Sequence, residues 1–127
     1  AVTTPGQMAA AVETLPDDTI IFIGLLSANL EAGLDTLVAQ ADQYNVPIFA
    51  TGRGGATSFP ITDYTTTFAG QAEQGAQMVD RIFKGASPAN TPVETAEYYL
   101  FVNLKAAQTY GVEVSDDILK QAFEITR

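Results

Sequence analysis

Three short segments of this sequence carry side chains that could hold a small polar molecule. They combine hydroxyls, an amide, a guanidinium and an aromatic ring, at Ser27, Asn29, Thr51, Gly52, Arg53, Thr67 and Phe68. A glycine lets the backbone approach a ligand closely, and Arg53 is able to grip a carboxylate through two parallel hydrogen bonds. An aromatic wall with a few polar groups is typical of small-molecule pockets. These residues therefore predict the binding of a small solute.

Each segment also has a plainer interpretation. Ser27 and Asn29 lie beside a predicted helix N-terminus, where free N–H groups favour an anion, but either side chain could simply cap that helix. Arg53 lies in a glycine-rich stretch that matches no phosphate-binding fingerprint, and it could be a solvated surface residue. Phe68 could belong to the core. The sequence leaves these alternatives open.

The composition argues against an enzyme. The chain has no His and no Cys, so the commonest general base, the commonest metal ligand and the thiolate nucleophile are missing. We therefore expect no catalytic residue, no bound metal and no cofactor. The net charge is −9, and the 6 basic residues are scattered. Nucleic acid is excluded as a partner because it needs a basic surface to neutralise its phosphates.

The elements that must position the three segments alternate between strand and helix. Runs rich in β-branched residues predict strands buried on both faces, and apolar residues at helical spacing predict amphipathic helices. The predicted strands span residues 19–24, 46–50, 61–67 and 97–102. The predicted helices span residues 7–15, 69–84, 104–110 and 115–127, with another from a cap at 27 or 29 to 44. This order predicts one α/β domain over residues 1–127, a three-layer α/β/α sandwich with a mostly parallel sheet.

The three polar segments follow the first three predicted strands. In open parallel sheets, ligands bind beyond the carboxyl ends of the strands. We therefore expect the segments to meet at the end of the sheet where these strands finish and to form the binding site there.

Four stretches of the chain resemble a known family. They are residues 20–24 with the helix that follows, residues 45–50, residues 74–85, and the tail from residue 91 to residue 114. The tail, with TPVE, YLFVNLKAA and YGVEV in order, is the most distinctive. Together they resemble the C-terminal lobe of a type I periplasmic substrate-binding protein of an ABC importer, in the TrpX-like group.

The resemblance implies a two-lobed protein that traps a small solute, such as an amino acid, in the cleft between its lobes. It implies an ABC permease as partner and a periplasmic or extracellular location, with the parent protein anchored as a lipoprotein. This chain would form one wall of the cleft and would lack the N-terminal lobe and the first strand–helix unit of its own lobe. An exposed sheet edge would remain, through which we expect two copies to form a homodimer.

Three positions depart from the pattern of that family. A Ser-Ala-Asn triplet at 27–29 replaces an Asp-Asn-Thr-like triplet, Gly-Arg at 52–53 replaces an acidic residue, and Thr-Phe at 67–68 replaces an Asp-Tyr pair. A solute amino group would lose its counter-charge and an acidic solute would gain one, so the identity of the solute stays open. The alternative function is a ligand-sensing domain of the same fold in a signalling or regulatory protein.

Overall fold

The structure is a computed structural model that describes residues 4–24, 28–52 and 59–127, without the side chains of residues 28–30. Its centre is a five-stranded sheet in the order β1-β2-β3-β4-β5. The strands are β1 (Ile21–Ile23), β2 (Ile48–Ala50), β3 (Thr62–Thr65), β4 (Tyr99–Asn103) and β5 (Glu124–Thr126). Only the β3–β4 pair is antiparallel among these strands. The predicted α/β class with a mostly parallel sheet is confirmed.

Four helices begin at a residue whose side-chain oxygen caps the first turn, and some helices end just before a residue with a left-handed backbone. They are α1 (Pro5–Glu13), α2 (Ala28–Gln43), α3 (Phe68–Phe83), the 3-10 turn η1 (Pro88–Asn90), α4 (Leu104–Thr109) and α5 (Asp116–Gln121). Side chains that cap a first turn are those of Thr4, Thr67, Asn103 and Ser115. Asn45 and Gly85 follow α2 and α3 with φ of 54° and 103°, as the sequence predicts for helix stops. No helix in the described ranges is long and apolar enough to cross a membrane.

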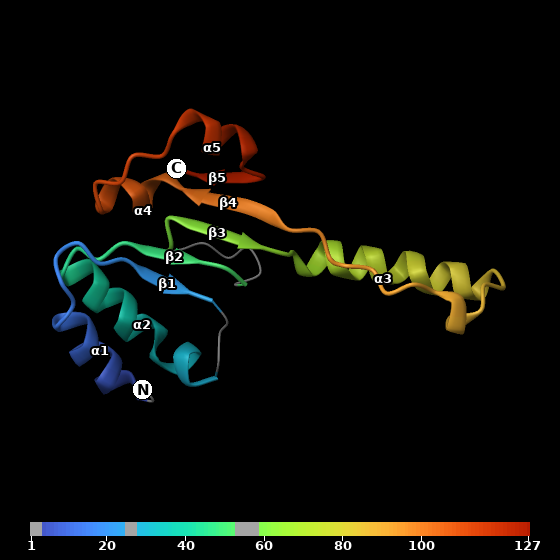
Figure 1. The fold of residues 1–127 in the computed structure, drawn as a ribbon, viewed down its shortest axis with the longest axis horizontal. Coiled ribbons are helices and arrows are strands. Elements are labelled where there is room, and N and C mark those ends of the chain that lie inside the picture. Colours follow the sequence, from blue (N-terminus) through green and yellow to red (C-terminus); the bar gives the residue numbers. More distant parts are fainter. Residues whose placement is uncertain (1–3, 25–27, 53–58) are drawn as a thin grey trace.

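α1 and α2 pack together and close a hydrophobic core against β1 and β2 (Figure 1). The buried residues of this core are Val12, Ile23, Leu34, Leu37, Ala41, Val46, Ile48 and Ala50. Gly33 of α2 lies directly against α1, because a Cβ at this position would come within 2.9 Å of Met8 Sδ. The absence of a side chain at Gly33 therefore sets how closely the two helices approach.

A smaller core joins α4 to the chain just before β3. Its buried residues are Ile61, Ala106, Ala107 and Tyr110. The Tyr110 hydroxyl donates a hydrogen bond of 2.6 Å to Asp42 Oδ1 on α2, which ties this core to the helical layer. Burial is the largest cause that raises the pKa of Tyr110, and the hydrogen bond to Asp42 raises it further. The phenol therefore stays protonated and acts as a donor at neutral pH.

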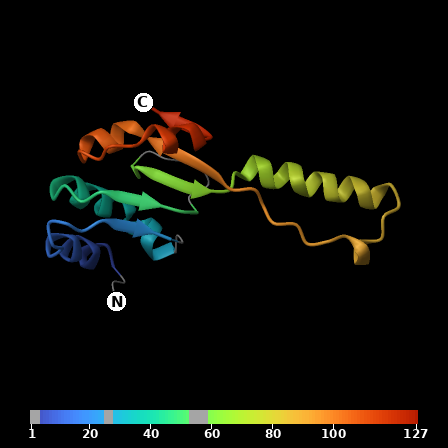
Figure 2. The same ribbon diagram turned by 45° about the horizontal axis from the view of Figure 1, so that its top comes forward.

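α3 does not cover the sheet. It projects from the end of β3, and residues 84–98 return alongside it to β4, so that residues 68–98 form an arm (Figures 1 and 2). The alternation of strands and helices predicts a parallel crossover at this point, and that detail is wrong. β3 and β4 are antiparallel neighbours, with Thr65 opposite Tyr99. An antiparallel pair is joined at one end of the sheet, so its connection has no need to cross a sheet face.

The C-terminus also differs from its sequence prediction. A helix is expected up to residue 127, but α5 ends at Gln121 and β5 follows. The Phe123 N–H donates to the Leu100 carbonyl at 2.8 Å. The Phe123 ring centroid lies 4.6 Å from that of Tyr99 and 5.6 Å from that of Phe101. Pairing with the free edge of β4 and these ring contacts outweigh the helical preference of the segment.

Replacing Tyr110 with Phe removes only the hydroxyl that binds Asp42. We expect the free energy of unfolding to fall by about 1–2 kcal/mol, because a hydrogen bond to a charged group is lost. Urea denaturation of both proteins measures this difference. Tyr64→Phe is the matched control, since Tyr64 is exposed, and it should change stability by less than about 0.5 kcal/mol. Equal midpoints for the wild type and Tyr110→Phe would contradict the assigned role.

Candidate functional site

A hollow of about 410 Å³ lies beyond the carboxyl ends of β1, β2 and β3. Its lining residues are Gly24, Thr51, Gly52, Thr65, Thr66, Phe68, Gln71 and Tyr98. They come from the ends of the three strands, from the first turn of α3 and from the return to β4. Because β1, β2 and β3 are parallel, their carboxyl ends lie at the same end of the sheet. In open α/β folds, ligands bind at this end.

Thr51 holds the three strand ends together. Its backbone N–H donates to the Ile23 carbonyl at 2.9 Å, and its hydroxyl donates to the Tyr64 carbonyl at 2.5 Å. Gly52 follows with a φ of 93°, a backbone region that favours glycine. These two residues fix the end of β2.

A capping interaction fixes the first turn of α3 at the rim of the hollow. The Thr67 hydroxyl accepts a hydrogen bond of 3.0 Å from the Gly70 N–H. A Cβ on residue 70 would lie 2.9 Å from the same hydroxyl oxygen, so glycine allows this close contact. One residue further on, Gln71 Nε2 donates to Thr66 Oγ1. The cap therefore determines where Phe68 and Gln71 lie.

Two exposed aromatic rings stand at the hollow. Phe68, where the chain enters the arm, is 78% exposed, and Tyr98, where it returns, is 51% exposed. Tyr98 stacks on Tyr64, with ring centroids 5.4 Å apart and planes inclined by 30°. Exposed ring surface beside hydroxyl and amide groups can cover the apolar or planar part of a small molecule while polar groups orient it.

The residues predicted from the sequence have different places in the structure. Three of them border the hollow: Thr51, Gly52 and Phe68. Thr67 lies next to these residues but uses its hydroxyl to cap α3. Ser27 and Arg53 lie outside the described residues, and so does the side chain of Asn29, whose backbone is in the first turn of α2.

The predicted site residues do not include five that line the hollow: Gly24, Thr65, Thr66, Gln71 and Tyr98. Gln71 could have been found, since it lies one turn of helix after the capping residue. Tyr98 is expected from the sequence to cover a sheet face. It reaches the hollow only because β4 returns antiparallel to β3, an orientation that the alternating pattern does not predict.

A second hollow, of about 350 Å³, lies along the arm and is lined by the carboxylates Glu73, Glu94 and Glu97. Hydrogen bonds from Arg81 and then Gln74 lower the pKa of Glu94. The Tyr99 hydroxyl donates to Glu97 at 2.7 Å, and this bond raises the pKa of Tyr99. Across the described residues, no three His, Cys, Asp or Glu side chains are placed to hold a metal ion. Glu94 braces the arm internally through Gln74 and Arg81, and Glu97 links the end of the arm to β4.

Comparison with known proteins gives a family for this fold. The model of the ABC transporter substrate binding protein family matches residues 1–126. No curated protein matches the chain.

Three solved structures share the fold. An ABC domain from Streptococcus pneumoniae in complex with L-Trp is 19% identical, with a TM-score of 0.70 over 95% of this chain and 41% of that chain. A conserved domain protein from Vibrio cholerae is 17% identical, with a TM-score of 0.72 over 98% of this chain and 43% of that chain. The ligand-free, open form of a Clostridium difficile substrate binding protein with adhesive properties is 13% identical, with a TM-score of 0.76 over 98% of this chain and 42% of that chain.

In each of these comparisons, the matched part is a much larger share of this chain than of the other chain. Nearly all of this chain has a counterpart in each structure, but it accounts for only 41–43% of the other chain. The fold described above is therefore one lobe of a larger architecture. Since the family model spans the sequence from residue 1 to residue 126, this chain belongs to the family of ABC transporter substrate-binding proteins.

Proposed function

We propose that this chain is one lobe of the solute receptor of an ABC importer and that it binds a small solute in the hollow beyond β1, β2 and β3. Membership of the family supports a substrate-binding role. The observation that carries the proposal is that two exposed rings, Phe68 and Tyr98, line one hollow together with hydroxyl and amide groups. In this role the chain binds and presents a solute and performs no catalytic step.

The proposed solute is an amino acid or a similar molecule with an apolar or planar part and a polar end. Phe68 and Tyr98 offer ring surface to the first part. Thr66 and Gln71 offer hydrogen bonds to the second. The similar structure from Streptococcus pneumoniae holds L-Trp, a molecule with both parts. A second lobe would complete the cleft by covering the open side of the hollow.

The partner that follows from this role is an ABC permease, which accepts the solute from the receptor. The proposed location is the periplasm or the outer surface of the cell, with a lipid anchor on the complete protein. The composition agrees with a binding protein, because the chain has neither His nor Cys for catalysis.

The proposal is tested by a thermal-shift screen of the two-lobed protein against amino acids, nucleosides and small carboxylates, since a bound solute raises the melting temperature by mass action. Tyr98→Ala should weaken the binding of the solute found in this screen by about tenfold or more, or about 1.4 kcal/mol, because ring surface is lost from the hollow. Isothermal titration calorimetry measures the affinity.

Tyr44→Ala is the matched control for that variant. Tyr44 is also an exposed tyrosine, but it lies before the amino end of β2, far from the hollow. Its replacement should leave the affinity unchanged. The importer proposal fails if no small solute shifts the melting temperature while a protein partner does, and the hollow is the wrong site if Tyr98→Ala binds like the wild type.

Arg53 decides whether the solute is acidic. It is the basic residue of the segment that follows β2, and a guanidinium binds a carboxylate in a two-pronged geometry. If it grips the solute, Arg53→Ala in the two-lobed protein should weaken an acidic solute by more than about tenfold, with little effect on a neutral one. Titrations with an acidic solute and its amide compare the two cases. An unchanged affinity would make Arg53 a surface residue.

A homodimer through a sheet edge is the second proposed interaction. Among the described strands, β1 lies at an edge of the sheet. The side chains of Ile20, just before it, and of Phe22, within it, are exposed. An uncovered apolar edge strand invites pairing with a second copy. Sedimentation velocity of the 127-residue chain should show a dimer that grows with concentration. A strictly monomeric profile at high concentration would count against it.

A further inference from the structure

The hollow beyond β1, β2 and β3 has an uncharged lining. None of the eight described residues that border it is an Asp, Glu, Lys or Arg. A charged group that leaves water needs an opposite charge or several hydrogen bonds to offset its lost hydration. The ammonium or carboxylate group of a solute finds no such counter-charge among these residues. We therefore expect the part of the solute that they hold to be uncharged.

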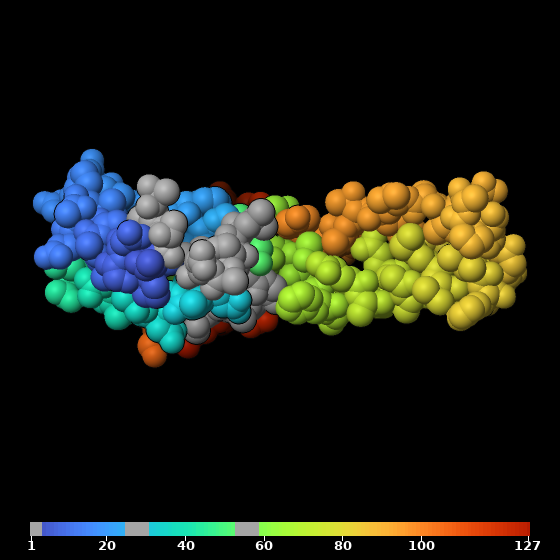
Figure 3. All heavy atoms as spheres, turned by 90° about the horizontal axis from the view of Figure 1, so that it is seen from below, coloured from blue at the N-terminus to red at the C-terminus, as the bar shows by residue number. Residues whose placement is uncertain are grey.

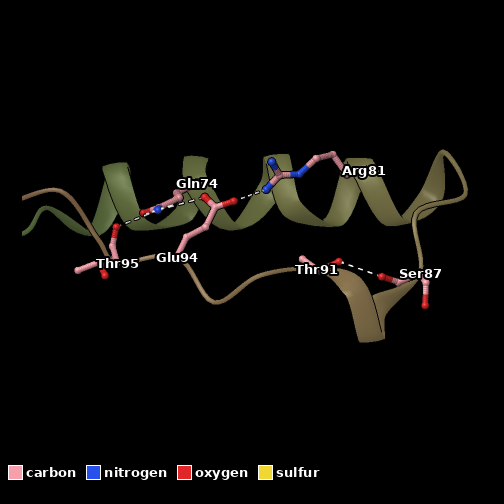
Figure 4. A network of polar contacts seen from close by, with 6 residues as sticks. All are labelled: Gln74, Arg81, Ser87, Thr91, Glu94 and Thr95. Carbon is pink, nitrogen blue, oxygen red and sulfur yellow. Dashed lines mark hydrogen bonds and ion pairs between the residues drawn. The ribbon is translucent and has the colours of Figure 1, made fainter.

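The charged side chains of the arm lie away from this hollow or border another one. The arm is a narrow extension of a wider body (Figure 3). Arg81 forms an ion pair with Glu94 on the arm (Figure 4). Arg81 follows Gln71 by 10 residues, so its place on α3 is about 15 Å farther along the helix axis. Glu73 lines the second hollow and not this one.

Two aromatic side chains give the hollow surface for a flat group. Tyr98 stacks on Tyr64, and a stacked ring covers only one face of its partner. Tyr98 is still half-exposed, so ring surface remains for a solute. The Phe68 ring, which borders the same hollow, is more exposed still. Unpaired nucleic-acid bases stack on aromatic side chains of this kind.

Gln71 offers a hydrogen-bonding edge at the same hollow. One hydrogen of its Nε2 is donated to Thr66 Oγ1, which holds the amide in place. Within the described residues, its second Nε2 hydrogen and its Oε1 have no protein partner. An amide with a free N–H and a free oxygen donates to and accepts from one edge of a base, as glutamine does with adenine in DNA complexes.

This combination narrows the class of solute. A lactam ring has an N–H and a C=O side by side in one plane, so it matches both the ring surface and the amide of Gln71. The indole of L-Trp has an N–H but no acceptor beside it, and the hydroxyls of a saccharide do not lie in one plane. The hollow of about 410 Å³ is also within the range of about 300–1,000 Å³ that is common for small-molecule sites.

We infer that the solute is a nucleoside or a free nucleobase with a lactam edge, and that Gln71 is the residue that recognises this edge. The heterocycle lies against Phe68 and Tyr98, and the Gln71 amide exchanges a pair of hydrogen bonds with it. The inference rests on the proposed function as a solute receptor and specifies the planar part of the solute.

Isothermal titration calorimetry of the two-lobed protein tests this inference with five compounds. They are uridine, inosine, 3-methyluridine, 1-methylinosine and L-tryptophan. We expect uridine or inosine to bind. Methylation of the ring nitrogen should weaken binding at least about tenfold, because the edge loses its donor and a methyl group blocks the contact.

The possible failures of this test differ. Binding of L-tryptophan without either unmethylated nucleoside would overturn the inference and leave the proposed function standing. Equal affinities for methylated and unmethylated nucleosides would also overturn it, because the edge would not be recognised. If none of the five compounds binds, the inference is wrong, and the wider thermal-shift screen decides on the proposed function separately.

A pair of variants assigns the contact to one residue. Gln71→Leu keeps a side chain of similar size without the amide. It should weaken uridine or inosine by about tenfold or more and remove the preference over the methylated form. Gln77→Leu makes the same change at the second hollow and should alter neither quantity. Thermal unfolding shows whether each variant is folded, and a preference retained in folded Gln71→Leu would overturn the role of Gln71.

Discussion

The antiparallel pairing of β3 with β4 decides where the other parts of the lobe lie. The two strands are in register from Thr62 opposite Val102 to Thr65 opposite Tyr99. Because they run in opposite directions, the end of β3 and the beginning of β4 share one end of the sheet. The intervening chain must leave and return at that end, which places the base of the arm beside the hollow. A parallel crossover would have put Phe68 and Tyr98 at opposite ends of the sheet.

Several modest interactions make that junction specific. Thr51 links the ends of the first three strands, Thr67 starts α3 at a fixed residue, and Tyr98 stacks on Tyr64 where the chain returns. A single hydrogen bond or ring contact of this kind is worth about 1 kcal/mol. The geometry of the rim therefore depends on their combination, and the same residues that shape the hollow also hold the arm at its base.

Local features of the fold could be predicted from the sequence because their causes are local. Asn45 ends α2 with a left-handed backbone, and Ser115 caps α5, both as expected from residue type. Strand direction and β5 could not be predicted, because they depend on distant partners such as the rings around Phe123. The site residues also include some that the sequence predicts and some that depend on distant parts of the fold. Thr51 follows from its position after a parallel strand, whereas Tyr98 requires the direction of β4.

The double attachment of the arm gives it the mechanics of a lever. Its two chain segments join the sheet side by side at β3 and β4, with β1 and β2 on one flank and β5 on the other (Figure 1). Both segments are thus anchored in the antiparallel pair of β3 and β4. The fulcrum lies at Thr65 and Tyr98, which also line the hollow. A small displacement there is magnified at Phe83, a helix length away.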